Sequence, residues 1–205
     1  MSSPRQADPR PEIPPEARAL LDGATFGYLA LAAGDDGYPL VVPVNFACLG
    51  DDIVLHGSPR GEKMRALARD DRATFSVARA YSLIPSHFGG RSDACAASQY
   101  FVSVVARGRV RLVDAPSEKA EALAALMAKL QPEGHYRPIS ADDPAYAASM
   151  EGTAVIRIAV ESISTRVKLG RSLAPERRAG ILAALAERGS PLDLETVEAV
   201  RRETT

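Results

Sequence analysis

The sequence predicts a mainly β protein, an antiparallel β-barrel with peripheral helices. Six segments with strand patterning follow one another between residues 25 and 169, and only short helical patterns interrupt them. A doubly wound parallel sheet would alternate each strand with a helix and would carry a GxGxxG motif after its first strand, which this chain lacks. Mostly adjacent strands therefore favour an antiparallel barrel.

Composition narrows the class of protein. The 205 residues suffice for one sizeable domain, and the formal net charge of −1 does not favour non-specific nucleic-acid binding. No apolar run approaches the roughly 20 residues that span a bilayer, and the first residues lack the apolar stretch of a secretory signal. The two cysteines have no CxxC spacing, so we expect free thiols and no metal site. These features predict a cytoplasmic protein that binds a small molecule, without a nucleic-acid or membrane partner.

The chain is expected to contain three parts. Residues 1–13 are polar, Pro-rich and without periodicity, which predicts a disordered arm. Residues 14–172 carry the barrel pattern. Residues 173–205 encode two short amphipathic helices separated by the sequence GSP, a C-terminal helical extension.

The domain begins with a short helix, because Pro14-Pro15 suits a first helical turn and Gly23 suits a helix end. The segment 25–33 then predicts a strand, and the sequence GDDG gives the hairpin turn to a return strand over 38–47. The sequence LGDD is a second turn, which leads into a third strand over 52–57.

Longer elements fill the rest of the domain. A helix over 61–69 precedes a fourth strand over 72–80. Residues 85–98 are expected to form a long loop, and loops of this length in a compact domain often have a function. Residues 99–114 predict a long strand with alternating apolar positions. A helix with apolar residues at helical spacing follows Asp114.

The last part of the domain is irregular after this helix. It contains one short expected helix near 142–149 and ends in a long strand over 153–169.

The stretch from Pro39 to Lys63 carries the candidate binding site. A strand that passes through the glycine-containing loop SPRG into a helix can present backbone N–H groups and a lysine to an anion. Lys63, near the start of the helix, is thus the candidate phosphate anchor, and a helix-surface lysine paired with an acid is the alternative. His56 is either a cofactor or substrate contact or a satisfied strand-end histidine. Asn45 either ends a strand or marks an irregular edge beside Pro43 where a ligand approaches.

These motifs are familiar in combination. Four segments follow one another in an order that resembles the pattern of the pyridoxamine 5'-phosphate oxidase-like, FMN-binding split-barrel superfamily: VVPVNF, LHGSPRGEKMRAL, QYFVSVVARGRVRLVD and PSEKAEAL. The resemblance covers residues 15 to 172. Within the superfamily, the chain is most similar to the subgroup that includes the 5-nitroimidazole reductases and other small flavin-nucleotide-binding proteins. It implies an antiparallel split β-barrel, a homodimer, and FMN in a cleft at the dimer interface.

The resemblance also implies cofactor-binding residues. The backbone of four consecutive residues would run along the isoalloxazine edge: Val42, Pro43, Val44 and Asn45. His56 and Gly57 match an aromatic or polar pair at the end of the third strand, and Lys63 matches the basic residue that grips the FMN phosphate.

The second half of the chain supplies three further matches. Ser103 matches a polar position that faces the flavin, and Lys168 and Arg171 match a basic segment that can close over the cofactor. Two differences argue against pyridoxamine phosphate as the substrate: Glu62 stands where the oxidases carry arginine, and their C-terminal Trp and Arg pattern is absent.

The resemblance implies an FMN-dependent oxidoreductase that acts on a small organic substrate, including a nitro-aromatic one. No residue is assigned as a catalytic acid or base. One alternative is a non-catalytic flavin-binding protein with a sensing or regulatory role. The other is the same fold with a deazaflavin or with haem, for which His56 would be the axial ligand.

Overall fold

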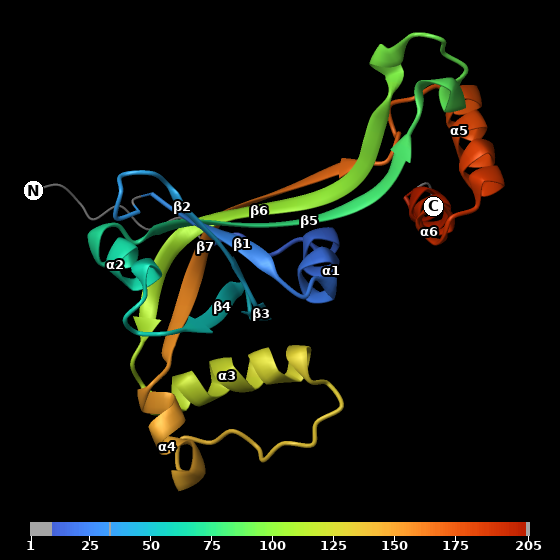
Figure 1. The fold of residues 1–205 in the computed structure, drawn as a ribbon. Helices are drawn as coiled ribbons and strands as arrows, with labels where there is room; N and C mark the ends of the chain where they lie inside the picture. Colours follow the sequence, from blue (N-terminus) through green and yellow to red (C-terminus); the bar gives the residue numbers. More distant parts are fainter. Residues whose placement is uncertain (1–9, 33, 204–205) are drawn as a thin grey trace, which may run out of the picture. The chain divides into compact units, whose positions relative to one another are not determined.

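A computed structural model describes residues 10–32 and 34–203 (Figure 1). In these residues the strands are β1 (Gly27–Leu31), β2 (Leu40–Val44), β3 (Phe46–Leu49), β4 (Asp52–Gly57), β5 (Arg72–Ile84), β6 (Ser98–Val113) and β7 (Ala154–Lys168). The α-helices are α1 (Pro15–Gly23), α2 (Glu62–Arg69), α3 (Pro116–Leu130), α4 (Pro144–Glu151), α5 (Pro175–Arg188) and α6 (Pro191–Arg202). Two 3-10 helices, η1 (Ser86–Gly89) and η2 (Ala94–Ala96), lie between β5 and β6.

The strands form one sheet in the order β2-β1-β5-β6-β7-β4-β3, and the pairs with a defined register are antiparallel. Three strands separate β5 from β3 in this order, yet the rings of Phe75 in β5 and Phe46 in β3 are 4.6 Å apart between centroids. The sheet must therefore curl on itself, as a half-barrel does. The expected antiparallel split-barrel architecture is confirmed.

The described residues divide into two compact units. The first contains the residues up to Val77 together with Val104–Ser164, and the second contains Ala78–Ser103 together with the residues from Thr165 onward. The expected boundary at residue 172 falls inside the second unit, because the C-terminal helices share that unit with the residues between β5 and β6.

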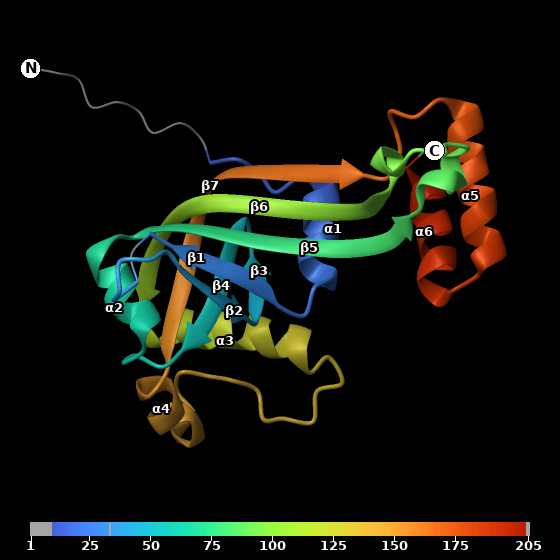
Figure 2. The same ribbon diagram turned by 45° about the horizontal axis from the view of Figure 1, so that its top comes forward.

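The first unit is built around the inner face of the curled sheet. Its core takes apolar side chains from every strand of this unit and from α1 and α2. Helix α3 covers the other face of β3 and β4 through Leu126 and its neighbours (Figure 2). Ile13, in the expected N-terminal arm, is buried in this core, and its N–H donates to Asp51; residues 1–9 of that arm lie outside the described residues.

Two strands of the first unit approach each other closely at Gly108. A Cβ on Gly108 of β6 would lie 2.0 Å from the backbone oxygen of Ala159 in β7. Only glycine allows this distance, because any side chain would overlap the neighbouring backbone.

In the second unit α5 packs against η1 and against α6 (Figure 1). This unit has an apolar core and also a polar network around Asp193, which is fully buried at the first turn of α6. Asp193 accepts hydrogen bonds from the Ser82 hydroxyl at 2.5 Å and from the Arg188 guanidinium, and it completes a capping box with Ser190. The Arg188 guanidinium holds the pKa of this carboxyl well below its usual range.

The expected elements agree with the observed ones, with two differences of extent. The expected return strand over 38–47 is two strands, because Asn45 interrupts the ladder between β2 and β3. The expected fourth strand continues four residues further, to Ile84, because its far end packs in the second unit. Residue 33, at the end of the expected first strand, lies outside the described residues.

Candidate functional site

The candidate site is the connection between β4 and α2. Gly57 ends β4, and the loop up to Gly61 includes a turn in which the Arg60 N–H donates to the Ser58 hydroxyl at 3.2 Å. Helix α2 then begins at Glu62 with no side-chain cap. The N–H groups of a first helical turn have no acceptor within the helix, and the helix dipole adds positive potential there. This loop therefore offers donors to an anion.

Lys63 lies against the end of β4. A Cβ on Gly57 would lie 2.7 Å from the Nζ of Lys63, so the ammonium occupies the space that a side chain would fill. The lysine is half-buried, and burial lowers its pKa. No carboxylate in the described part of the chain forms an ion pair with it. The alternative of a surface lysine paired with an acid thus finds no support among these residues.

Several other charged groups near the start of α2 pair with one another. Asp35, in the turn between β1 and β2, accepts from Arg65 at 2.6 Å and from Arg69 at 3.1 Å, and Arg65 holds the pKa of this carboxyl below its usual value. The Glu62 carboxylate accepts from the Asp35 N–H at 3.3 Å. Lys63 keeps its unpaired positive charge beside these neutralised groups.

The predicted isoalloxazine contacts lie in and after β2, which is an edge strand of the described sheet. Val44 is in the core, whereas Pro43 is exposed and opposite Tyr28 in the register. The Asn45 side chain donates to the Thr25 carbonyl at 2.9 Å, so it has the role of a strand-end residue. An edge strand leaves alternate backbone groups available to a ligand. His56 is exposed and pairs with Val155 in the register of β4 and β7.

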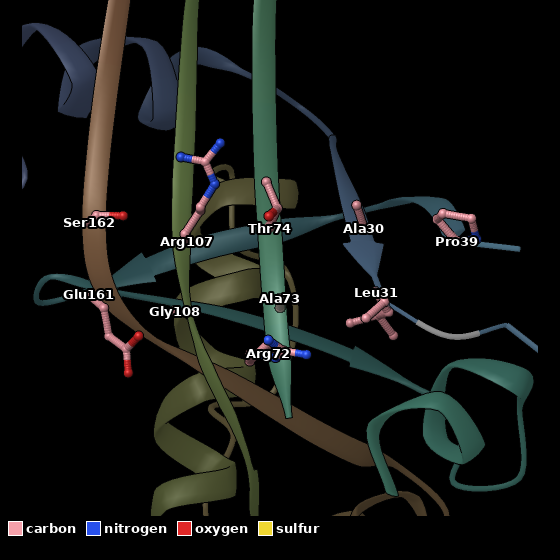
Figure 3. A pocket seen from close by; sticks show the side chains of 11 residues that line it. Ala30, Leu31, Pro39, Arg72, Ala73, Thr74, Arg107, Gly108, Glu161 and Ser162 are labelled. Carbon is pink, nitrogen blue, oxygen red and sulfur yellow. The ribbon is translucent and has the colours of Figure 1, made fainter. Parts of the chain in front are cut away.

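A hollow of about 590 Å³ lies on the first unit, and sequence reasoning did not find it. Its lining comes from β1, β5, β6, β7 and Pro39 (Figure 3). Arg72, Arg107 and Glu161 contribute its charges; Arg72 pairs with Asp70 at 2.6 Å, whereas Arg107 has no ion-pair partner among the described residues. None of the predicted site residues lines it. The sequence signal for this hollow is the polar alternation in β6.

Apolar side chains are exposed on the sheet near this hollow. Tyr28 is 49% exposed and Val41 is 56% exposed. They belong to one face, because Tyr28 pairs with Pro43 and Ala30 pairs with Val41 in the register of β1 and β2.

The remaining predicted residues belong to the second unit. Ser103 is half-buried in β6, whereas Lys168 and Arg171 are exposed at the end of β7 and line a cavity of about 390 Å³. The structure thus brings Gly57 and Lys63 together in the first unit, and Lys168 and Arg171 together in the second.

Residues 10–32 and 34–203 contain neither a candidate metal site nor a disulfide. These residues contain no group of three or more His, Cys, Asp or Glu side chains placed to hold a metal ion. Burial raises the pKa of the Cys48 thiol, whereas Cys95 is exposed. Within the same residues, no helix has the length and apolar character needed to cross a membrane.

Solved structures share this fold. The flavocytochrome Anf3 from Azotobacter vinelandii is 25% identical, with a TM-score of 0.64 over 82% of this chain and 73% of that chain. An FAD and heme binding protein from Mycobacterium smegmatis is 23% identical, with a TM-score of 0.64 over 82% and 78% of the two chains. A candidate 5-nitroimidazole antibiotic resistance protein from Bacteroides thetaiotaomicron is 21% identical, with a TM-score of 0.57 over 72% and 79%.

The sequence itself matches one family model. No curated protein matches the chain. The model described as pyridoxamine 5'-phosphate oxidase matches residues 14–167, which include β1 to β6, the β4–α2 loop and most of β7. The chain therefore belongs to the pyridoxamine 5'-phosphate oxidase family.

Proposed function

We propose that this protein is an FMN-binding oxidoreductase that holds the flavin phosphate at the β4–α2 loop. The observation that carries the proposal is the half-buried, unpaired ammonium of Lys63 beside Gly57. A desolvated cation without a partner is costly in a folded protein unless an anion neutralises it.

The residues at this site fit a phosphate group. The ammonium supplies charge, and the first-turn N–H groups of Glu62 and Lys63 supply directed donors. Asp35 is already bound by Arg65 and Arg69, so its negative charge opposes the phosphate less than a free carboxylate would.

A bound flavin supplies transfer of two electrons between an organic donor and an acceptor. The chain itself binds and orients the cofactor. Lys63 fixes the phosphate end, and the edge strand β2 offers backbone groups from Val42 to Asn45 to the polar edge of the ring. We assign no acid or base to the chain. A small organic molecule, including a nitro-aromatic one, is the proposed substrate.

We further propose a homodimer formed through the exposed face of β1 and β2. Tyr28, Val41 and Pro43 are exposed on this face, and contiguous apolar surface of this kind usually meets a partner. The hollow bounded by Arg107 lies on neighbouring strands and would then be closed by the second copy. Such a dimer would exclude water from this hollow.

A haem protein of the same fold is the second candidate. Two relatives support it: the flavocytochrome and the protein described as binding FAD and heme. In this chain His56 is exposed at the end of β4 and is the residue proposed as an axial ligand.

One experiment separates these functions. The absorption spectrum of the purified protein is recorded alone, then during titration with FMN, with FAD and with haem. The proposal predicts the bands of bound oxidised flavin, and bleaching of these bands by a reductant followed by recovery when a nitro-aromatic acceptor is added. Flavin bands without recovery would indicate a binding or sensing protein. A strong haem band that His56→Ala abolishes, without flavin binding, would overturn the proposal.

A further inference from the structure

The second unit contains a cavity of about 390 Å³ whose charges are all positive. Arg166, Lys168, Arg171 and Arg177 line it, and no acidic side chain does. Apolar residues of β5, β7 and α5 form the rest of the wall. The combination suits a small organic anion, with its charged end at the arginines and its body on the apolar wall.

Most of this positive charge is not neutralised within the described residues. Arg171 pairs with Glu203 at 3.3 Å. Arg166, Lys168 and Arg177 form no ion pair in the part of the chain that the structure describes, although Lys168 lies over the ring of Phe101. Asp93, in the adjoining hollow, is already bound to Arg91 at 2.7 Å.

Two residues that line this cavity each carry a buried donor without an acceptor. The hydroxyl of Tyr100 and the Nε of Arg177 are both inaccessible to solvent, and neither has a hydrogen-bond partner. Tyr100 is 4% exposed, and burial raises the pKa of its hydroxyl, so the group stays a donor. A buried donor without an acceptor costs free energy, which a ligand oxygen would recover when a small side-chain shift brings the donor to the cavity surface.

Two glycines leave room for these donors. A Cβ on Gly170 would lie 2.2 Å from the Tyr100 hydroxyl, and Gly170 has a φ of +75° that favours glycine. A Cβ on Gly89 would lie 2.7 Å from the Nε of Arg177. Side chains at these positions would displace both donors from the cavity wall.

We propose that this cavity binds a phosphate-bearing small molecule, with Arg166, Lys168 and Arg177 around the phosphate and the Tyr100 hydroxyl as an additional donor. Three unneutralised cations match a phosphate dianion better than a single carboxylate, and arginine presents a fork that fits phosphate oxygens. Arg177 is also in the first turn of α5, which has no side-chain cap, so the positive end of that helix contributes. This cavity belongs to the second unit, whereas Lys63 belongs to the first.

The test is calorimetric titration of the full chain with phenyl phosphate, both alone and saturated with FMN, with phenol as the neutral probe. The proposal predicts that phenyl phosphate binds and phenol does not, and that Arg166→Gln weakens binding about 10-fold. Tyr100→Phe should weaken it several-fold without loss of thermal stability, because it removes a buried donor that has no partner in the fold. Arg202→Gln, an exposed arginine paired with Glu198 at 3.8 Å, is the control and should change nothing.

The same titration distinguishes two sources of the phosphate. If FAD binding blocks phenyl phosphate and Arg166→Gln weakens FAD but not FMN, the phosphate belongs to the dinucleotide. If the FAD-loaded protein still binds phenyl phosphate, the ligand is a separate phosphorylated molecule. Absence of phenyl phosphate binding in both states, or binding that Arg166→Gln and Tyr100→Phe leave unchanged, would overturn the proposal. Failure of FMN to bind would contradict only the flavin assignment.

Discussion

The ammonium of Lys63 fills the space beside Gly57 that a side chain at that position would occupy: a Cβ there would lie 2.7 Å from Nζ. Gly57, at the end of β4, and Lys63, in the first turn of α2, thus pack against each other. This contact gives the sequence HGSPRGEK a physical role, because it holds a desolvated cation at the positive end of a helix.

Gly57→Ala should weaken FMN binding about 10-fold and leave the fold intact. The new methyl group meets only the flexible end of Lys63, which can move away, so the phosphate loses a charge-assisted contact. FMN titration and thermal unfolding measure the two effects. Gly23→Ala is the control, since a Cβ there meets nothing within 4 Å. An unchanged FMN affinity in Gly57→Ala would show that the ammonium is not a phosphate contact.

Gly108→Ala, unlike Gly57→Ala, should disrupt the fold of the first unit. Its Cβ would lie 2.0 Å from the Ala159 backbone oxygen, which cannot move without opening the contact between β6 and β7. The measurement is circular dichroism and solubility of the purified variant. A soluble variant with the thermal midpoint of the parent would contradict the close approach of β6 and β7 described above.

Lys63→Met should keep or raise stability at neutral pH. Burial lowers the pKa of Lys63 in the folded protein, so the unfolded chain binds the proton more tightly. Below the folded pKa the charge opposes folding, and the opposition disappears as the pH rises toward the ordinary lysine value of about 10.4. Unfolding midpoints at pH 7 and pH 10 should therefore show an advantage for the methionine variant that is smaller at pH 10. A variant less stable than the parent at pH 7 would indicate an unrecognised partner for Lys63.

Asp193→Ala should destabilise the second unit by about 3 kcal/mol, because it removes the buried carboxylate that accepts from Ser82 and leaves Arg188 with the Leu83 carbonyl as its remaining acceptor. For a chain of this size the thermal midpoint would fall by roughly 6–12 °C. The pKa of the carboxyl is lowered in the fold, so its contribution is complete above about pH 4 and is lost as the pH falls toward the folded pKa. The parent should therefore lose its advantage over the variant in strong acid. Glu198→Gln, which touches only an exposed pair, should cost less than about 1 kcal/mol.

The proposed dimer should dissociate when charge is placed on the exposed face of β1 and β2. Tyr28→Glu combined with Val41→Glu puts two carboxylates on this face, and their desolvation would oppose association. Light scattering after size-exclusion chromatography should show a dimer for the parent and a monomer for the variant. Leu194→Glu, at a residue that is 51% exposed in the second unit, is the matched control. A monomeric parent would remove the dimer and the interface cleft from the account.

Local signals in the sequence predict most of the fold. Pro15 and Gly23 mark α1, the GDDG turn marks the β1–β2 hairpin, and alternation marks β6. The break at Asn45 was less evident, because its side-chain bond to Thr25 depends on a residue 20 positions away. The far end of β5 is equally non-local, since Ser82 is fixed by Asp193 and Thr196 from α6.

The sequence signals for the candidate sites also divide into local and non-local ones. Lys63 is a candidate from the sequence because its signal is local: a strand, a glycine loop and a helix start. The hollow beside Arg107 and the cavity around Arg177 were missed, because each is assembled from strands and helices far apart in the chain. Lys168 and Arg171 were named from the resemblance, but Tyr100 reads as an ordinary core residue until its unpartnered hydroxyl is seen.

The most direct test of the flavin proposal is the dissociation constant of FMN for the parent, for Lys63→Met and for Lys129→Met. Both lysines are half-buried and burial lowers the pKa of both, but Lys129 donates to the Leu21 carbonyl at 2.7 Å and lies 3.5 Å from the centroid of the Phe46 ring. We predict that Lys63→Met weakens FMN binding about 10- to 100-fold, whereas Lys129→Met lowers stability and leaves the affinity unchanged. Equal FMN affinity in the parent and in Lys63→Met would contradict the account.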